Sequence, residues 1–318
     1  MPESLALLLS VAVFPGGVFA LGLGLALKGV DRRLAARLQR RVGPPLMQPV
    51  FDLAKLTRKW TMVPEGACRP VFLGAPLAGV VAMLLAAALV PVPGLYEPSP
   101  ALGDLLVLFY LLAVPAVVLM LAGSASGSPF GAIGFSREMM LMLAYEVPIV
   151  LVIVAVGLKT GIGRGEGITL SLTEIVRYQR VHGAFLLDPA MWPALLAFLA
   201  FFPANLGIVP FDLAEAETEV LEGPLLEYSG PALGLFKMMS AVKAVVVLGL
   251  GICLFFPSGP DGLPGLAIHA LKMLALMALG VSVLRVSAGR MRIDQAFGFF
   301  LKWPLALAVA GVAAAVLA

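Results

Sequence analysis

The densest group of ionisable side chains lies in residues 210–230, PFDLAEAETEVLEGPLLEYSG, which contain no lysine or arginine. The carboxylates of this segment are Asp212, Glu215, Glu217, Glu219, Glu222 and Glu227. If residues 212–222 form a helix, most of these groups share one face, and their mutual repulsion raises some pKa values. That arrangement suits the uptake and release of protons. A solvated acidic loop or a docking surface for a basic partner fits the composition equally well, whereas a metal site lacks histidine or cysteine ligands.

Two further carboxylates belong to an apolar stretch, REMMLMLAYEVPIV. Glu138 begins the predicted membrane helix 138–158, and Glu146 lies near its middle. An ionised side chain at the centre of a membrane helix costs roughly 2.5–3.5 kcal/mol on insertion scales. A spacing of eight residues places both carboxyl groups on one broad face of the helix. A carboxyl group that changes between neutral and charged forms can pass protons, and pairing with a basic neighbour is the alternative.

Three lysines also lie inside predicted membrane helices. Lys243 is well inside its helix, so it requires a carboxylate partner or a water-filled cavity. Glu146 is a candidate partner for it. Lys237 either joins the same polar group or extends to the cytoplasmic edge of the membrane. Lys272 lies in the next predicted helix, and together these lysines complete a candidate set of ion-translocation residues.

The composition indicates which elements must position these groups. Hydrophobic residues make up 60% of the 318 residues and charged residues only 13%, whereas soluble domains carry about 25% charged residues. This excludes a soluble enzyme, a disordered protein and a nucleic-acid-binding protein. The sequence predicts an all-α, polytopic membrane protein with one integral membrane domain, 1–318, because about 20 apolar residues cross a bilayer. The eight predicted membrane helices are 4–28, 71–91, 104–123, 138–158, 191–209, 232–256, 264–286 and 299–317.

The distribution of lysine and arginine predicts the orientation of these helices. Fifteen of them lie in or next to the loops on one side of the membrane, and four lie on the other side. The basic side is predicted to be cytoplasmic, with both chain termini on the outer side. The predicted cytoplasmic loops are 29–70, 124–137, 210–231 and 287–298.

The first of these loops is strongly basic and is divided by Gly43-Pro44-Pro45. If its first half is helical, a cluster of arginines shares one face, and its second half, 46–60, has the pattern of an amphipathic helix. One interpretation is a helix at the membrane interface that contacts anionic lipid. The other is a platform on which a cytoplasmic subunit docks. The candidate docking residues are Arg33, Arg37, Arg40, Arg41 and Arg137.

Cysteine and histidine are too scarce to hold a redox cofactor. Cys68 and Cys253 cannot provide a disulfide framework or the four thiolates of an iron–sulfur cluster. The two histidines exclude a pair of haems with two histidine ligands each. The sequence therefore predicts no cofactor on this chain, so that any redox centre lies in another subunit or is a diffusing molecule.

Four stretches of the sequence carry a family resemblance: RLQRRVGPPLMQPVFDLAKL, GSPFGAIGFSREMMLMLAYEVP, the 210–230 segment and MRIDQ. They resemble subunit 1 of respiratory complex I and its homologues in membrane-bound [NiFe]-hydrogenases, over nearly the whole chain. The short connection between RVGPP and LMQP is similar to the hydrogenase and formate hydrogenlyase branch. By matching motif, Glu146 corresponds to an acidic channel residue, and Arg137 and Glu138 belong to the SREMM pattern of the hydrogenase branch. The acidic loop of the family matches Asp212, Glu215, Glu217, Glu222 and Glu227.

The resemblance implies a subunit that joins a peripheral redox arm to an ion-pumping membrane arm of a hetero-oligomeric complex. Its implied partners are iron–sulfur hydrogenase-like small and large subunits on the cytoplasmic side, antiporter-like membrane subunits and lipid, with no nucleic acid. The iron–sulfur clusters and the NiFe centre are expected in those partner subunits.

Two positions depart from the complex I pattern. Asn205 and Ser240 stand where complex I relatives carry glutamate, so the proton route and quinone site of complex I do not transfer intact. The main hypothesis is a subunit that couples electron transfer in a hydrogenase-type arm to proton or sodium translocation. The alternatives are a quinone-binding subunit of a complex I-like NADH or ferredoxin:quinone oxidoreductase, and a structural membrane anchor.

Overall fold

The computed structural model describes residues 3–98, 104–165, 167–257 and 259–317, with only the backbone for 3–7 and 217. Within these ranges the regular structure is helical, and β structure is limited to two isolated bridges. The α-helices are α1 (Glu3–Ala12), α2 (Gly17–Leu38), α3 (Gln48–Thr57), α4 (Arg69–Leu89), α5 (Leu105–Ala125), α6 (Pro129–Gly163), α7 (Leu172–His182), α8 (Trp192–Asn205), α9 (Glu217–Val220), α10 (Gly230–Phe255), α11 (Leu263–Met277), α12 (Leu284–Ser287) and α13 (Ile293–Leu317).

The prediction of an all-α membrane protein is confirmed, with one difference in helix length. Among the described residues, seven helical stretches are long and apolar enough to cross a membrane. The predicted span 191–209 corresponds to α8, which has 14 residues and is shorter than the roughly 20 needed to cross a bilayer. It is shortened because the chain turns at Leu206 and Gly207, where Gly207 has a φ of 62°.

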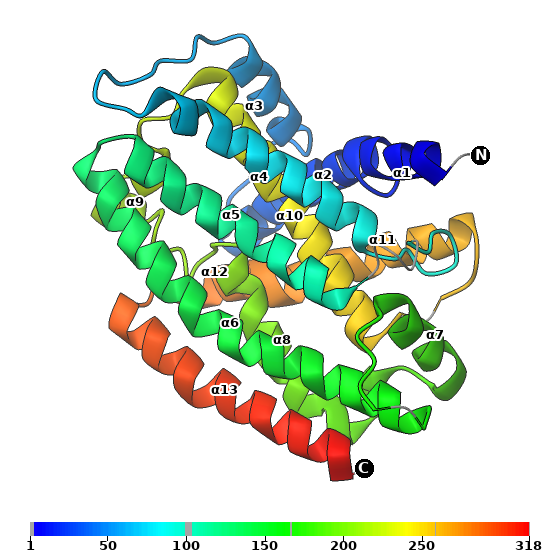
Figure 1. Cartoon of the computed structure of the whole chain (residues 1–318). Coiled ribbons are helices and arrows are strands. Elements are labelled where there is room, and N and C mark those ends of the chain that lie inside the picture. Colours follow the sequence, from blue (N-terminus) through cyan, green and yellow to red (C-terminus); the bar gives the residue numbers. More distant parts are fainter. Residues whose placement is uncertain (1–2, 99–103, 166, 258, 318) are drawn as a thin grey trace.

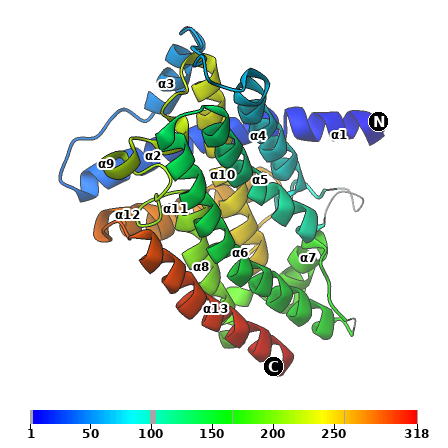
Figure 2. The ribbon, with the colours of Figure 1, turned by 60° about the vertical axis from the view of Figure 1, so that its left-hand side comes forward.

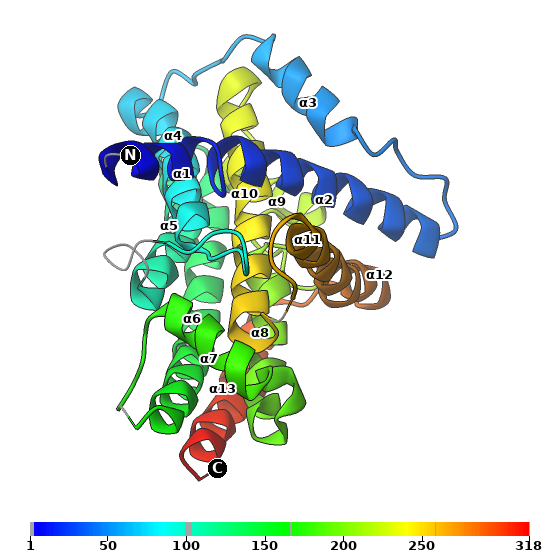
Figure 3. The ribbon, with the colours of Figure 1, turned by 90° about the vertical axis from the view of Figure 1, so that its right-hand side faces the viewer.

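Helix α10 forms the centre of the molecule. It contacts α2, α3, α4, α5, α7, α8 and α11, and it runs as a column through the bundle in Figure 3. In the most apolar 18-residue stretch of α10, 89% of the residues are buried. A helix buried on all sides must be apolar on all sides, and α10 is apolar throughout except for its few polar groups on one flank. Helices α6 and α13 pack along each other at the edge of the bundle (Figure 1).

Two predicted membrane helices are interrupted. The span predicted at 4–28 is divided between α1 and α2 at Phe14-Pro15-Gly16, because proline and glycine do not continue a helix. Helix α2 continues to Leu38, beyond the predicted start of the loop at residue 29. The arginines at the start of that predicted loop therefore belong to α2. The span predicted at 264–286 changes to a π-helix at Ala278–Val283 before α12. Such π segments inside helices often lie at functional positions.

A glycine permits α2 to cross α10 at backbone contact. A Cβ atom added at Gly24 would lie only 2.2 Å from the carbonyl oxygen of Ala241. Gly22, on the same helix, has no atom within 4 Å of its added Cβ. The two positions therefore form a matched pair for testing the crossing.

We expect Gly24→Ala to destabilise the protein by about 1–3 kcal/mol, the usual cost of overpacking a core. Gly22→Ala should be neutral or slightly stabilising, because alanine favours a helix more than glycine does. Thermal unfolding of the purified protein in detergent measures both. Equal melting temperatures for the two variants would contradict the close crossing.

The four predicted cytoplasmic loops meet at one end of the bundle. The amide of Cys68 donates to the carbonyl of Ala125, which joins the first loop to the second. The amide of Met62 donates to Ser229 Oγ, and the amide of Met291 donates to the carbonyl of Pro210. Figure 2 shows α3 and α9 toward this end, and α7 and the C-terminus toward the other.

Candidate functional site

The acidic segment 210–230 is not the continuous helix considered above. Only Glu217–Val220 is α-helical, and Leu221 and Glu222 adopt left-handed backbone conformations with φ of 52° and 68°. Gly223-Pro224 follows immediately, and this pair prevents the helix from continuing. The prediction of one acidic face over 212–222 is therefore wrong, and the carboxylates point to different surroundings.

Backbone contact with α6 holds this segment in place. An added Cβ at Gly134 would lie 2.5 Å from Cδ of Pro224, and one at Gly223 would lie 2.1 Å from the carbonyl oxygen of Ala214. The segment thus folds on itself and lies against the small-residue face of α6. A side chain at Gly134 would move the segment away from α6, and one at Gly223 would disturb the fold of the segment itself.

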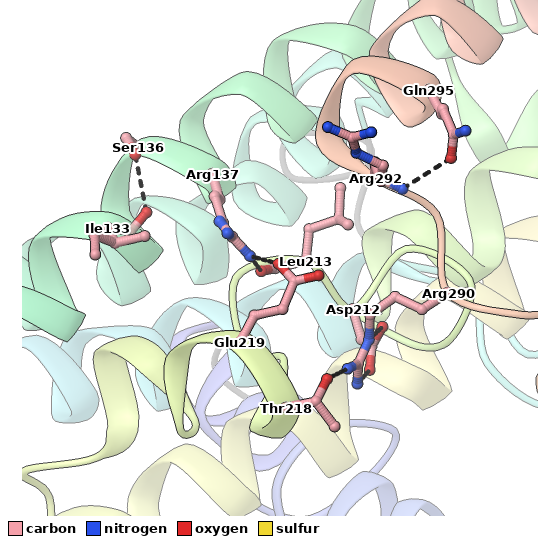
Figure 4. A network of polar contacts seen from close by, with 10 residues as sticks. All are labelled: Ile133, Ser136, Arg137, Asp212, Leu213, Thr218, Glu219, Arg290, Arg292 and Gln295. Carbon is pink, nitrogen blue, oxygen red and sulfur yellow. Dashed lines mark hydrogen bonds and ion pairs between the residues drawn. The ribbon is translucent and has the colours of Figure 1, made fainter.

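Two of the predicted acidic residues have counter-charges from distant parts of the chain (Figure 4). Arg290 Nε and Nη2 bind the two oxygens of Asp212 at 2.8 and 2.5 Å, and Nη1 binds the Thr218 hydroxyl. Arg137 pairs with Glu219 and also donates to the carbonyl of Leu213. The interpretation of these acids as lacking counter-charges is wrong, because sequence distance concealed the arginines.

A cavity of about 270 Å³ lies where α2, α6 and α10 meet the acidic segment. Its wall combines apolar side chains such as Leu119, Phe236 and Met277 with an unusual number of charged ones. The charged residues that line it are Lys28, Asp31, Arg32, Glu138, Asp212, Glu215, Lys237, Lys243 and Arg285. This cavity is therefore the candidate functional site.

Lys243, Asp31 and Glu138 are the most enclosed charged residues of this cavity, with 6%, 8% and 9% of their surfaces exposed. Glu215, in the loop, is half-buried, and Lys237 is exposed. The carboxylates whose charges interact with Lys243 are those of Glu138 and Glu215. The predicted partner Glu146 does not line the cavity, so that pairing is wrong. It failed because the loop, rather than the middle of α6, approaches α10.

A separate polar group fixes the wall formed by α2. The buried carboxylate of Asp31 accepts a hydrogen bond from Ser282 Oγ at 2.6 Å and pairs with Arg285 Nη1 at 3.1 Å. Ser282 lies in the π-helical turn, so the irregular backbone orients a hydroxyl toward α2. Asp31 is thereby charge-balanced within the chain.

Several predicted residues lie outside the cavity. Glu146 is half-buried on α6, and Glu222 is exposed. Glu227 is half-buried near the start of α10, whereas the side chain of Glu217 is outside the described part of the chain. Lys272 donates a hydrogen bond from Nζ to the carbonyl of Phe256 at 2.7 Å. The roles predicted for these residues stay predictions.

The predicted docking arginines fall into two groups. The side chains at the C-terminal end of α2 and just beyond it are exposed, namely Arg33, Arg37, Arg40 and Arg41. Arg137 is instead engaged by Glu219 inside the chain. The amphipathic helix predicted at 46–60 is confirmed as α3, and an ion pair of 2.9 Å between Arg32 and Asp52 connects it to α2.

Sequence reasoning missed Lys28, Asp31, Arg285 and Arg290. Lys28 donates from Nζ to Ser240 Oγ at 2.6 Å across the cavity. The spacing of Lys28 and Asp31 by three residues was a usable signal, because both share one face of a helix. The surrounding arginines concealed it by suggesting a solvated basic loop.

Burial raises the pKa of the Glu215 carboxyl, and the charges of Lys237, Lys28 and Lys243 oppose that rise. An unfolded glutamate titrates near about 4.3. The pKa of Glu215 in the folded protein is above this value. Its contribution to the free energy of unfolding is therefore complete at lower pH and is lost as pH rises through the folded pKa. We therefore expect the melting temperature to decrease more steeply with rising pH in the wild type than in Glu215→Gln. Curves that are already parallel in the range just above about pH 4.3 would contradict the burial of this charge.

Comparison with known proteins places the whole chain in a family. A family model described as NADH dehydrogenase matches residues 11–316. The chain belongs to the NADH dehydrogenase family. Formate hydrogenlyase subunit 4 of Escherichia coli is 35% identical over 274 residues, covering 84% of this chain and 86% of that protein. NADH-quinone oxidoreductase subunit 8 of Thermus thermophilus is 34% identical over 297 residues, covering 87% and 78%.

The chain has the same fold as a chain of a solved structure. It is the structure of the membrane-bound sulfane sulfur reductase, described as an archaeal respiratory membrane complex. One of its chains matches with a TM-score of 0.86 and 28% identity, covering 98% of this chain and 99% of that one. The predicted family resemblance is confirmed, and the chain is a multi-pass membrane protein of the type found in multi-subunit respiratory complexes.

Proposed function

We propose that this chain is the membrane subunit that couples electron transfer in a peripheral [NiFe]-hydrogenase-type arm to proton or sodium translocation. The observation that carries this proposal is the cavity. It brings Glu138 and Glu215 together with three lysines between membrane helices and the end of the bundle where the loops meet. Groups that are costly to bury as ions respond strongly to a change of nearby charge.

The route of the response follows from the geometry. A charge that appears on a partner beside the acidic segment acts first on Glu215, which lies in the loop. Glu138 is next, because it lines the same cavity from α6. Glu146 lies eight residues further, about 12 Å along the same helix, and continues the series of carboxyl groups away from the loop. The lysines stabilise each carboxylate while it is charged.

We infer positions for the partner subunits from the exposed surfaces and from the named relatives. Iron–sulfur hydrogenase-like small and large subunits would occupy the end where the four loops meet, beside the exposed arginines of α2. Antiporter-like membrane subunits would pack against an outer face of the bundle. This arrangement agrees with relatives named as subunits of formate hydrogenlyase and hydrogenase-4. Iron–sulfur clusters and the NiFe centre would belong to those partners.

The apolar part of the cavity wall supports a second candidate function, quinone binding. Leu119, Phe236 and Met277 would contact the ring of a quinone or its apolar isoprenoid chain. Several relatives are named NADH-quinone oxidoreductase subunits. Asn205 and Ser240 line the same cavity, at positions where the resemblance places glutamate in complex I. A quinone would be a substrate here and not a resident cofactor.

One assay separates the two functions. The native assembly, isolated through this chain, is reconstituted in liposomes and supplied with reduced viologen or ferredoxin. Hydrogen evolution with ion uptake and without quinone supports the proposed coupling function. Electron transfer that requires quinone would assign the chain to the second candidate. Electron transfer without ion movement in either case would leave only an anchoring role.

A further inference from the structure

The charges around the cavity do not balance. Four of its nine charged lining residues are already paired, because Arg32 pairs with Asp52, Asp31 with Arg285, and Asp212 with Arg290, and five remain. Those five are Lys28, Lys237 and Lys243 against Glu138 and Glu215. With every group ionised, the described side chains leave one excess positive charge, and protonation of either carboxyl group increases it.

Direct ion pairs do not relieve this excess. Among the described side chains, no lysine of the cavity lies within 4.0 Å of a carboxylate oxygen. Lys28 binds the neutral hydroxyl of Ser240. Lys243 is buried, with 6% of its surface exposed. The structure gives its ammonium group no hydrogen bond to another described side chain. An ammonium group has three donors and requires acceptors for them, and because Lys243 lines the cavity, the contents of that space must supply them.

The donors converge from two helices. Lys237, Ser240 and Lys243 recur every three residues, which places them along one side of α10. Lys28 approaches from α2 and reaches the middle member of this row, Ser240. Ammonium and hydroxyl groups therefore surround one part of the cavity, whose total volume of about 270 Å³ equals about nine water molecules at about 30 Å³ each.

We propose that this part of the cavity binds one small monovalent anion, such as chloride, between Lys28, Lys237 and Lys243. One negative charge cancels the excess with both carboxylates ionised, and it supplies the missing acceptor for Lys243. The cavity has room for such an ion together with several water molecules. The proposal is independent of the coupling function, because it concerns equilibrium binding and not transport.

Binding of radiolabelled chloride to the intact assembly tests the proposal. The assembly is isolated through this chain in chloride-free gluconate buffer, and saturable binding is measured by equilibrium dialysis. We expect the wild type to bind one chloride more per complex than Lys243→Gln does. Lys237→Gln should raise the Kd of this site at least about tenfold, equivalent to about 1.4 kcal/mol. Lys243→Arg, which keeps the charge, should retain the site.

Lys272→Gln is the matched control. It also removes a lysine from a membrane helix, but Lys272 is hydrogen-bonded to the Phe256 carbonyl and does not line the cavity. We expect its chloride binding to equal that of the wild type. Subunit composition on a gel confirms that each variant still assembles. The proposal is overturned if the wild type binds no saturable chloride, or if Lys243→Gln and Lys237→Gln bind it as the wild type does.

Discussion

Replacing Glu138 or Glu215 by glutamine is expected to abolish ion uptake driven by electron transfer while the assembly remains intact. Both carboxyl groups line the cavity, and they are the ones that have no ion pair among its described side chains. Glutamine keeps the shape and some hydrogen bonding but cannot bind or release a proton. Since a positioned acid or base contributes about 100-fold or more to proton transfer, uptake should decrease to the level of passive leak.

The measurement compares two quantities in the same liposomes: electron transfer to the acceptor, and ions taken up per electron. In Glu138→Gln and Glu215→Gln this ratio should decrease, because electron transfer continues while ion uptake does not. Glu222→Gln is the control on the same acidic segment, because Glu222 is exposed and does not line the cavity. An unchanged ratio in both cavity variants would refute the coupling role.

Most of the helical architecture followed from hydropathy alone. Apolar stretches of about 20 residues predict membrane helices strongly, because the bilayer permits few other structures. The errors arose where local backbone chemistry overrides hydropathy. Pro15 and Gly16 divide the first span, and Gly207 shortens α8. In the π-helical turn at Ala278–Val283, Ser282 contacts Asp31, which is 251 residues away in sequence.

The candidate site was less predictable for a related reason. Residue type identified Glu138, Glu215 and Lys243 as unusual, since each is costly to place beside a membrane core. Sequence could not pair them, because the cavity forms only when the loop folds over α6 and approaches α10. The interpretation therefore assigned Lys243 to Glu146, and it left the acidic segment without counter-charges. Both errors concern long-range contacts for which no local pattern exists.

The contact between Arg290 and Asp212 should be the strongest of these long-range ties. Removing one member of a buried ion pair costs about 3–5 kcal/mol. Asp212 and Arg290 keep 15% and 25% side-chain exposure, so we expect Arg290→Gln to lower stability by about 2–3 kcal/mol. The loss should be greatest in the acidic segment, because both oxygens of Asp212 are bound by Arg290. Thermal unfolding and limited proteolysis of the 210–230 segment measure it.

A double variant shows whether the loss of stability comes from the broken ion pair or from a general effect of the substitution at the surface. Asp212→Asn combined with Arg290→Gln removes both charges, so the uncompensated carboxylate no longer exists, and the double variant should be more stable than Arg290→Gln alone. Arg177→Gln breaks the exposed pair with Glu97 and should change little. If Arg290→Gln behaves like Arg177→Gln, the acidic segment is held by its backbone contacts with α6. In that case the wall of the cavity would depend on glycine packing and not on charge.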